Sequence, residues 1–316
     1  MTNPHRKIWR NGEFIAWENA TVHVLSQSLQ RGTLGFDYMS VHQTERGPAI
    51  FRLQEHVQRL ITTCEITGLQ LAYSKAELMA ACAHTVRENP GAKSVKISAL
   101  IPSIEVELVP QDPRVSVFIA AYDSLTDIVQ PHVKAGHRPL HQSPLVALKI
   151  ERHISNRRED IIPAQAKVAA NYTSPMMAKL QAREEGFDDV LLLNERQGVA
   201  EAPTSNIFIV NGNGELLTPT SDEVLLGITR DSIITLAAAL GITCREQDIT
   251  EQDLLAAREV FLTATSMGVW PVVRIDQTVY GNGKPGPLTQ RLQQKHTAVS
   301  RGEDPEFAHW LHYVDE

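Results

Sequence analysis

The stretch from residue 164 to residue 208, AQAKVAANYTSPMMAKLQAREEGFDDVLLLNERQGVAEAPTSNIF, decides how this chain is interpreted. It holds Lys167 in a run of small residues, Tyr172 five positions later, and Glu201 just before a strand-like run. A lysine among alanines and valine has few hydrophilic neighbours and can be partly desolvated, which lowers the pKa of its amine from about 10.4. Such an amine is a usable nucleophile toward a carbonyl. The stretch therefore indicates a Schiff-base lysine, and pyridoxal 5'-phosphate (PLP) is the commonest cofactor that requires one.

The bulk composition is that of an ordinary globular protein. The chain has 316 residues, 42% of them hydrophobic and 21% charged, which suits two domains with separate cores. Its formal net charge is −7 and no long block carries one sign, so neither nucleic acid nor an anionic membrane is an expected partner. No apolar run approaches the ~20 residues of a membrane span. The polar N-terminus lacks a signal-peptide core, and the three cysteines are few and far apart. We therefore expect a cytoplasmic protein with reduced cysteines.

Periodicity predicts a chain that mixes strands and helices. Short apolar runs separated by turn signals over residues 7–53 predict antiparallel strands, and the helical spacing over 55–67, closed by Gly68, predicts an amphipathic helix. Ser174 is expected to cap a helix that starts at Pro175. Thr229 is expected to cap a later helix that begins directly after it. The other expected elements are strands at 95–101, 115–121, 145–150, 190–193, 206–210 and 259–262, and helices at 75–88, 251–258 and 287–299.

One segment without a clear period divides the chain. Residues 126–144 are rich in His, Pro, Gly and Gln, which is typical of a connection between domains. We therefore expect a small N-terminal α/β domain over 1–132, a linker over 133–145 and a large C-terminal α/β domain over 146–316. The irregular segment 126–144 contains His132, His137 and His141, but it lacks the helical spacing or cysteine pairs of a strong metal site, so we expect no metal.

A PLP enzyme must hold a phosphate, a pyridine nitrogen, a phenolic oxygen and an aldehyde, and the sequence offers a group for each. The helix start around Ile228 and Thr229 offers backbone N–H groups for phosphate, as does the hydroxyl-rich turn at 263–266. Arg59 lies off the apolar stripe of its helix and can give phosphate a bidentate fork. Glu201 could pair with the pyridine nitrogen, and Tyr172 could donate to the ring oxygen.

Each of these residues also has a plainer interpretation. Lysines are mostly solvated, and an arginine off the apolar stripe is usually on the solvated face of its helix. Thr229 is an ordinary helix cap, and Glu201 an ordinary carboxylate in a turn. The functional interpretation is favoured by the joint order of these residues and by the sequence words that flank them.

Those words resemble one family. The segments HVLSQSLQRGTLGFD, FRLQEHVQRL, AKVAANY, VAEAPTSNIF, LLGITRDSI and FLTATSMGVWPV are similar, in this order, to class IV aminotransferases. These fold-type IV PLP enzymes include branched-chain aminotransferases, D-amino-acid aminotransferases, R-selective amine transaminases and aminodeoxychorismate lyases. The resemblance runs from about residue 8 to residue 293. It implies an α/β (α+β) fold of two domains, like that of D-amino-acid aminotransferase, with the active site in the interdomain cleft.

The resemblance also implies roles for particular residues. Lys167 matches the Schiff-base lysine that shuttles the proton, and Arg59 matches the arginine that binds the phosphate. Tyr172 matches the tyrosine on the ring oxygen, and Glu201 matches the carboxylate on the pyridine nitrogen. The expected phosphate cup consists of Ile228, Thr229, Thr265 and Ser266. Family members are homodimers or larger, with each site closed by a loop from the neighbour, and we expect the same here.

The substrate side departs from the branched-chain pattern. The motif F-E-G-I-R-x-Y of branched-chain aminotransferases reads FDYMSVH in this chain, so that Tyr38 replaces glycine and Ser40 replaces arginine. Their Y-I-R reads Lys96-Ile97-Ser98, and Arg31 stands where a tyrosine is usual. Arg31 or Lys96 could therefore replace the missing carboxylate-binding groups. The FDYMSV wording also resembles R-selective amine transaminases.

The expected reaction is ping-pong transamination from a branched-chain-like amino acid or an R-amine to a 2-oxo acid. Two alternatives stay open. One is a lyase on the same scaffold, which would release pyruvate from an aminodeoxychorismate-like substrate. The other is a PLP-binding protein with little catalysis, although the presence of Lys167, Tyr172 and Glu201 together argues against it.

Overall fold

We describe a computed structural model of the chain, which covers residues 5–130, 144–156 and 160–316. The described residues form two compact units. The first contains those within 1–139, 166–170 and 299–316, and the second those within 140–165 and 171–298. The domain bounds expected from the sequence, 1–132 and 146–316, stay a prediction. The short segment 166–170 and the C-terminal segment 299–316, however, belong to the first unit.

The first unit is built on an antiparallel sheet of seven strands in the order β16-β4-β3-β5-β6-β1-β2. Its central strands carry alternating buried and half-buried residues, because one face packs against helices and the other does not. The strands are β1 (Lys7–Arg10), β2 (Glu13–Ala16), β3 (Gly35–Thr44), β4 (Gly47–Phe51), β5 (Ser94–Leu100), β6 (Ser116–Tyr122) and β16 (Leu311–Tyr313).

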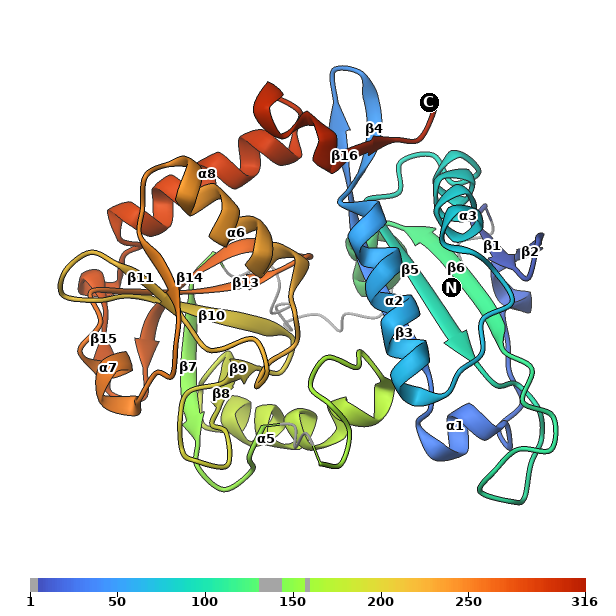
Figure 1. Ribbon diagram of the computed structural model, residues 1–316, viewed down its shortest axis with the longest axis horizontal. Helices are drawn as coiled ribbons and strands as arrows, with labels where there is room; N and C mark the ends of the chain where they lie inside the picture. Colours follow the sequence, from blue (N-terminus) through green and yellow to red (C-terminus); the bar gives the residue numbers. More distant parts are fainter. Residues whose placement is uncertain (1–4, 131–143, 157–159) are drawn as a thin grey trace. The chain divides into compact units, whose positions relative to one another are not determined.

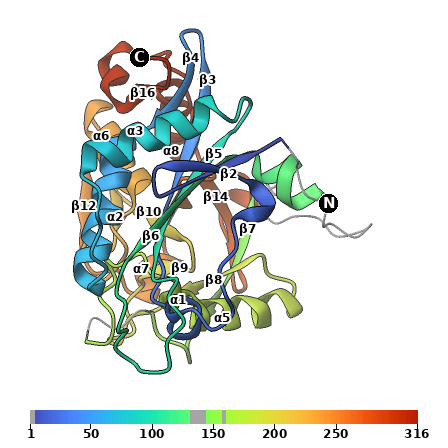
Figure 2. The same ribbon diagram turned by 90° about the vertical axis from the view of Figure 1, so that its right-hand side faces the viewer.

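Two helices, α2 (Leu53–Thr67) and α3 (Lys75–Arg87), lie side by side over one face of this sheet (Figures 1 and 2). Their apolar stripes form one core with the inward residues of the strands, including Val57, Leu60, Met39 and Ile97. Gly68 ends α2 at a φ of 72°, the left-handed conformation that glycine adopts without strain. The remaining helical segments are short: 3-10 helices at Trp17–Asn19 and Pro305–Trp310, α1 (Gln27–Arg31), and a π-helix at Ser124–Val129.

The second unit is built on a mixed sheet whose strands follow the order β12-β11-β10-β13-β14-β7-β8, with β9 paired to β10 and β15 to β14. Strand β10 is buried along its whole length, because the sheet is covered on both faces. The strands are β7 (Val146–Glu151), β8 (Asp189–Leu192), β9 (Glu201–Ala202), β10 (Ser205–Val210), β11 (Leu216–Thr218), β12 (Cys244–Glu246), β13 (Glu259–Ala264), β14 (Gly268–Ile275) and β15 (Thr278–Val279).

Helices cover this second sheet. Buried residues of α5 pack against β8. The rings of Phe208 on β10 and Phe261 on β13 are stacked, with their centres 5.1 Å apart. The helices are α5 (Thr173–Glu184), α6 (Ile228–Ala239), α7 (Glu251–Leu255) and α8 (Pro287–Ser300), with a 3-10 helix at Gly281–Gly283. A further 3-10 helix, Ala169–Tyr172, begins in the first unit and ends in the second.

The structure confirms the predicted strands and helices and corrects some of their ends. The helix predicted to begin at Pro175 begins at Thr173 with Tyr172 at its cap, and Ser174 accepts no capping bond there. Thr229 is not a cap either, because α6 begins one residue earlier and Gly227 occupies the cap position. The structure adds a π-helix over the first part of the segment predicted to be irregular. His132, His137, His141 and most of the expected linker lie outside the described residues.

Two classes of feature are absent from the described part of the chain. It contains no helix that is both long enough and apolar enough to cross a membrane. Within the same residues, no group of three or more His, Cys, Asp or Glu side chains is arranged to hold a metal ion. The cysteines Cys64, Cys82 and Cys244 are all free.

Candidate active site

Lys167 belongs to the first unit, in an extended segment that pairs with the start of β3. Its backbone carbonyl accepts a hydrogen bond from the Phe36 amide at 3.0 Å, and its own amide donates to Thr63 Oγ1 at 3.0 Å. The neighbours Ala166 and Val168 are fully buried, whereas Lys167 itself is half-buried. Its Nζ lies 5.0 Å from the centre of the Phe36 ring. The Lys167 amine therefore lies near an aromatic ring, on a side chain that is partly shielded from solvent.

Arg59 is held by a buried carboxylate. The Nε and Nη2 atoms of Arg59 donate to Asp37 at 2.8 and 2.9 Å, and the Nδ1 of His56 lies 2.7 Å from the same carboxylate. Burial raises the pKa of Asp37, but the charge of Arg59 and the contacts with His56 outweigh it, so that the pKa lies well below its usual range. Burial lowers the pKa of His56 despite the neighbouring carboxylate. We infer a neutral His56 that donates to an ionised Asp37, with the positive charge on Arg59.

Four of the five predicted substrate-side residues share one face of the first sheet. Tyr38 is paired with Lys96, and Ser40 follows Tyr38 two positions along β3. Ser98 follows Lys96 two positions along β5, and residues two apart on a strand point to the same side. The fifth residue, Arg31, ends α1 and is exposed, and its Nη2 lies 3.4 Å from the carbonyl of Val106.

In the second unit, Glu201 is buried at the start of β9. Its Oε2 accepts hydrogen bonds from Asn206 Nδ2 at 3.0 Å and from the Leu225 amide at 3.2 Å. Asn206 is paired with Glu201 across the strands, and its amide also donates to the carbonyl of Leu225 at 2.9 Å. The carboxylate is thus fixed in one orientation by a buried amide.

The N-terminus of α6 is packed against the same amide. A Cβ placed on Gly227, the cap residue, would lie 2.0 Å from Asn206 Oδ1, so this position accepts only glycine without a shift. Among the described residues no side chain makes a cap bond at this helix end, so the first amides of α6 are not satisfied by a side-chain cap. Ile228 and Thr229 are the first two residues of α6 and both are buried. A helix end of this kind suits a phosphate group.

Thr265 and Ser266 lie in the tight turn between β13 and β14, which Met267 N closes on Ala264 O at 3.2 Å. Thr265 is half-buried and Ser266 is exposed. The turn begins two residues after Thr263, which is paired with Asn206. The sheet register therefore brings Glu201, Asn206 and this turn to one end of the second sheet. Tyr172, in the same unit, is half-buried at the cap of α5.

The structure thus groups the predicted residues within each unit. Lys167, Arg59 and the substrate-side face lie in the first, and Glu201 with the start of α6 and the turn lies in the second. The sequence analysis assigned no supporting role to Asp37 or Asn206, and it did not identify Gly227 as the cap residue of α6. Each stands inside a quoted motif, but its role depends on a partner distant in sequence.

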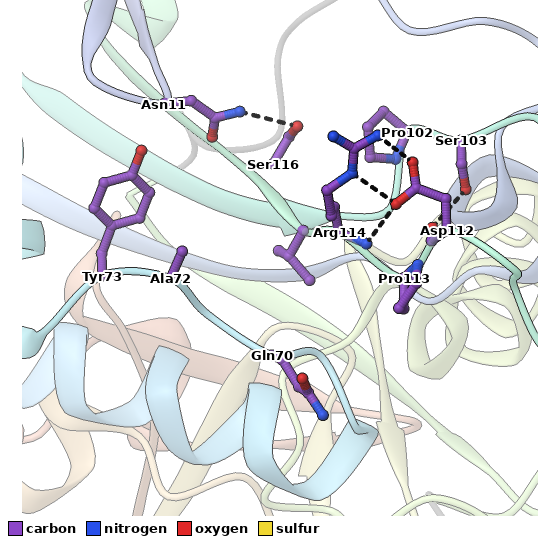
Figure 3. A pocket seen from close by; sticks show the side chains of 11 residues that line it. Asn11, Gln70, Ala72, Tyr73, Pro102, Ser103, Asp112, Pro113, Arg114 and Ser116 are labelled. Atoms are coloured by element: carbon purple, nitrogen blue, oxygen red, sulfur yellow. Dashed lines mark hydrogen bonds and ion pairs between the residues drawn. The ribbon is translucent and has the colours of Figure 1, made fainter.

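Figure 3 shows a cavity of about 550 Å³ on the first unit, apart from these groups. The bidentate ion pair between Asp112 and Arg114 lies at its rim, and Arg114 is largely exposed. All the site residues predicted from the sequence are described, and none of them lines this cavity.

The chain is similar to known proteins over nearly its whole length. A sequence model of the family described as amino-transferase class IV matches residues 36–275. The branched-chain-amino-acid aminotransferase of Escherichia coli (strain K12) is 34% identical over 316 residues, covering 98% of this chain and 97% of that protein. The branched-chain aminotransferase of Thermoproteus uzoniensis, solved with norvaline, has a TM-score of 0.88 and 30% identity, over 98% of this chain and 99% of the other. The branched-chain amino acid aminotransferase of Thermobaculum terrenum, solved in its PLP form, has a TM-score of 0.87 and 28% identity, over 99% of each chain. The chain belongs to the class IV aminotransferase family.

Proposed function

We propose that this protein is a PLP-dependent aminotransferase that moves an amino group from a branched-chain-like amino acid or an R-amine to a 2-oxo acid. The observation that carries the proposal is the Lys167 amine, which is half-buried on the Phe36 ring and tied to β3 and α2 by its backbone. The relatives support it, because they are branched-chain aminotransferases and one of them was solved in its PLP form.

The residues present suit PLP. An amine is available for its aldehyde at Lys167, and a cation for its phosphate at Arg59. The start of α6, which lacks a side-chain cap bond among the described residues, offers amides for the same phosphate. We assign the cofactor to Lys167, Arg59, Tyr172, Glu201, Ile228, Thr229, Thr265 and Ser266.

PLP, when bound, withdraws electrons from the substrate carbon that carries the amino group. With PLP bound, Lys167 Nζ would take the proton from that carbon and later give it up again, as a general base and then a general acid. Glu201 would hold a proton at the ring nitrogen, and the Asn206 amide keeps the carboxylate oriented for this task. Arg59, fixed by Asp37, keeps the phosphate end in place while the proton moves.

Two other activities use the same residues: release of pyruvate by a lyase, and simple carriage of PLP. The experiment that separates them mixes the protein with a panel of amino donors and two 2-oxo acids. An aminotransferase converts its cofactor to the pyridoxamine form with the donor alone and regains the starting form with the 2-oxo acid. Pyruvate formed without an acceptor would indicate the lyase, and no change with any donor would indicate the carrier.

The substrate side of the proposal involves Arg31, Tyr38, Ser40, Lys96 and Ser98. In this chain the arginines of the usual branched-chain wording are replaced by Ser40 and Ser98. We therefore expect weaker selection of a dicarboxylate acceptor and a wider range of donors than in a typical branched-chain enzyme.

The proposal includes a homodimer or larger homo-oligomer. In the first unit, α1 is joined to the loop after β5 by Gln27, whose side chain donates to the Leu108 carbonyl at 2.7 Å. Together with the segment before α1, they expose a set of large apolar side chains: Val24, Leu25, Leu29, Ile104, Val106, Leu108 and Val109. Several large apolar side chains exposed on neighbouring segments are typical of a protein interface. The proposal also includes a cytoplasmic location, which the free cysteines support.

A further inference from the structure

The face of the first sheet that α2 and α3 leave uncovered carries a distinct set of side chains. In β3, Asp37, Met39 and Val41 are buried toward the helices, whereas the residues between them are half-buried on the opposite face. The cross-strand pairs on that face are Phe36 with Ser98, Tyr38 with Lys96, and Ser40 with Ser94. Across the described strands β3, β5 and β6, Lys96 is the only lysine or arginine.

Lys96 and Lys167 share one aromatic ring. The Lys96 Nζ lies 4.8 Å from the centre of the Phe36 ring, and the Lys167 Nζ lies 5.0 Å from the same centre. The two nitrogens are therefore no more than about 10 Å apart. When the reacting carbon of an amino acid lies at Lys167 Nζ, a carboxylate of the same molecule can therefore come within reach of Lys96.

Hydroxyl groups lie on the same face beside Lys96. Tyr38 Oη is 2.5 Å from Ser94 Oγ and 3.3 Å from Ser124 Oγ. An ammonium group next to neutral hydroxyls suits an anion better than an apolar or cationic group. Lys96 is also half-buried, so its attraction to an anion is screened less than that of an exposed lysine.

We propose that Lys96 determines specificity by binding a carboxylate of the substrate, in place of the arginine and tyrosine of the usual branched-chain wording. The proposal rests on the proposed function, because it takes Lys167 as the reacting amine. It selects between the two donor classes left open by the sequence: carboxylate-bearing amino acids are favoured over plain R-amines. The carboxylate is either the one next to the reacting carbon or a distal one.

The test measures binding without turnover, so that it does not depend on activity. Isothermal titration of the PLP-loaded protein uses two inert acids, 4-methylvalerate and glutarate, with 4-methylvaleramide as the neutral counterpart. Four proteins are compared: wild type, Lys96→Met, Lys96→Arg and Lys93→Met. Lys93 is the matched control, since it lies three residues earlier, is largely exposed and pairs with Asp123 at 2.7 Å.

We expect Lys96→Met to weaken acid binding by roughly ten- to a hundredfold and to leave the amide unchanged. Lys96→Arg should recover part of the loss, and Lys93→Met should bind as wild type does. A loss for both acids assigns Lys96 to the carboxylate next to the reacting carbon, and a loss for glutarate alone assigns it to a distal one.

Three results would overturn the proposal: unchanged affinity for both acids in Lys96→Met, equal losses for acids and amide, or a wild type that does not prefer acid to amide. The proposed function fails separately, in the donor panel. A protein with Lys96-dependent acid binding but no amino transfer would keep this inference and refute the aminotransferase.

Discussion

At the scale of single residues, the least predictable feature is Asp37. The helical pattern places Arg59 off the apolar stripe, which predicts a solvated side chain, yet the structure holds it against a buried carboxylate. That carboxylate stands 22 positions earlier in the chain, on the covered face of β3. Helix periodicity reports which side of a helix is apolar, but it does not report which strand residue faces a given position. The sequence therefore singles out Arg59 as a candidate phosphate ligand, but it does not reveal that Asp37 holds its side chain.

Replacement of Arg59 by alanine should weaken PLP binding and also lower the free energy of unfolding, because it leaves the buried Asp37 carboxylate without its arginine. Loss of a charged fork to phosphate costs about 1.5–3 kcal/mol, or about one to two decades in affinity. The measurement is a PLP titration of the apo protein, with Arg114→Ala as the control, since Arg114 is largely exposed and pairs with Asp112 at a distant loop. Equal PLP affinity in Arg59→Ala and wild type would refute the phosphate role.

His42 should make the protein less stable in weak acid. Burial, with Arg301 nearby, lowers the pKa of His42 from 6.5 to about 4. Between these two pH values the unfolded chain binds the proton more strongly, so the free energy of unfolding is greatest above pH 6.5 and falls toward pH 4. The effect is at most about 3 kcal/mol.

The measurement is urea unfolding at several pH values in that window. His42→Gln should flatten the pH dependence, whereas His153→Gln, at an exposed position, should leave it as in wild type. If His42→Gln loses as much stability as wild type does on acidification, another group is responsible.

At the scale of elements, the sequence predicts what is local. The helix α2 and its stop at Gly68 follow from a clear apolar period and a glycine that takes a positive φ. The start of α6 does not follow from the local sequence, because Thr229 and Gly227 are both acceptable cap residues. The choice is made by Asn206, whose side chain fills the space a Cβ at residue 227 would need. That contact joins two segments about twenty residues apart, which a local pattern does not register.

Gly227→Ala should therefore disturb both α6 and the Glu201 carboxylate. The added Cβ meets Asn206 Oδ1, and the Asn206 amide is already bonded to Glu201 and Leu225. Overpacking of this kind costs roughly 1–3 kcal/mol in the free energy of unfolding. Gly212→Ala is the matched control, because no atom lies within 4 Å of its added Cβ and it needs no positive φ. Equal stability of the two variants, measured by urea unfolding, would contradict the packing argument.

At the scale of the whole molecule, composition and periodicity predict two units, but not which unit each short segment joins. Residues 166–170 stand among segments of the second unit, yet they pair with the start of β3 and belong to the first. The pairing depends on Gly32, Leu34 and Phe36, which accept or donate backbone hydrogen bonds to this segment. Backbone bonds can be made to any strand edge, so the side chains of a five-residue segment do not specify the partner.

The exposed apolar loop after β5 should join copies of the chain. Val106 and Leu108 are 89% and 73% exposed, and they lie in the surface segment joined to α1 by Gln27. The double substitution Val106→Asp, Leu108→Asp should shift the mass toward the monomer, because charge is costly in an apolar interface. Sedimentation measures this, with Val279→Asp as a control at a separate exposed position. If the wild type sediments as a monomer, the expectation of a homo-oligomer is wrong.

The central claim is that Lys167 is the amine that reacts with PLP. Borohydride reduction of the PLP-loaded protein fixes the cofactor to the amine that holds it, and peptide mapping then locates the modified lysine. We predict that the label lies on Lys167, in the peptide that contains AKVAANY. Lys96 provides the sharpest internal comparison, because its Nζ lies against the same Phe36 ring. Label on Lys96 or on any other lysine, or no stable label at all, would contradict the account.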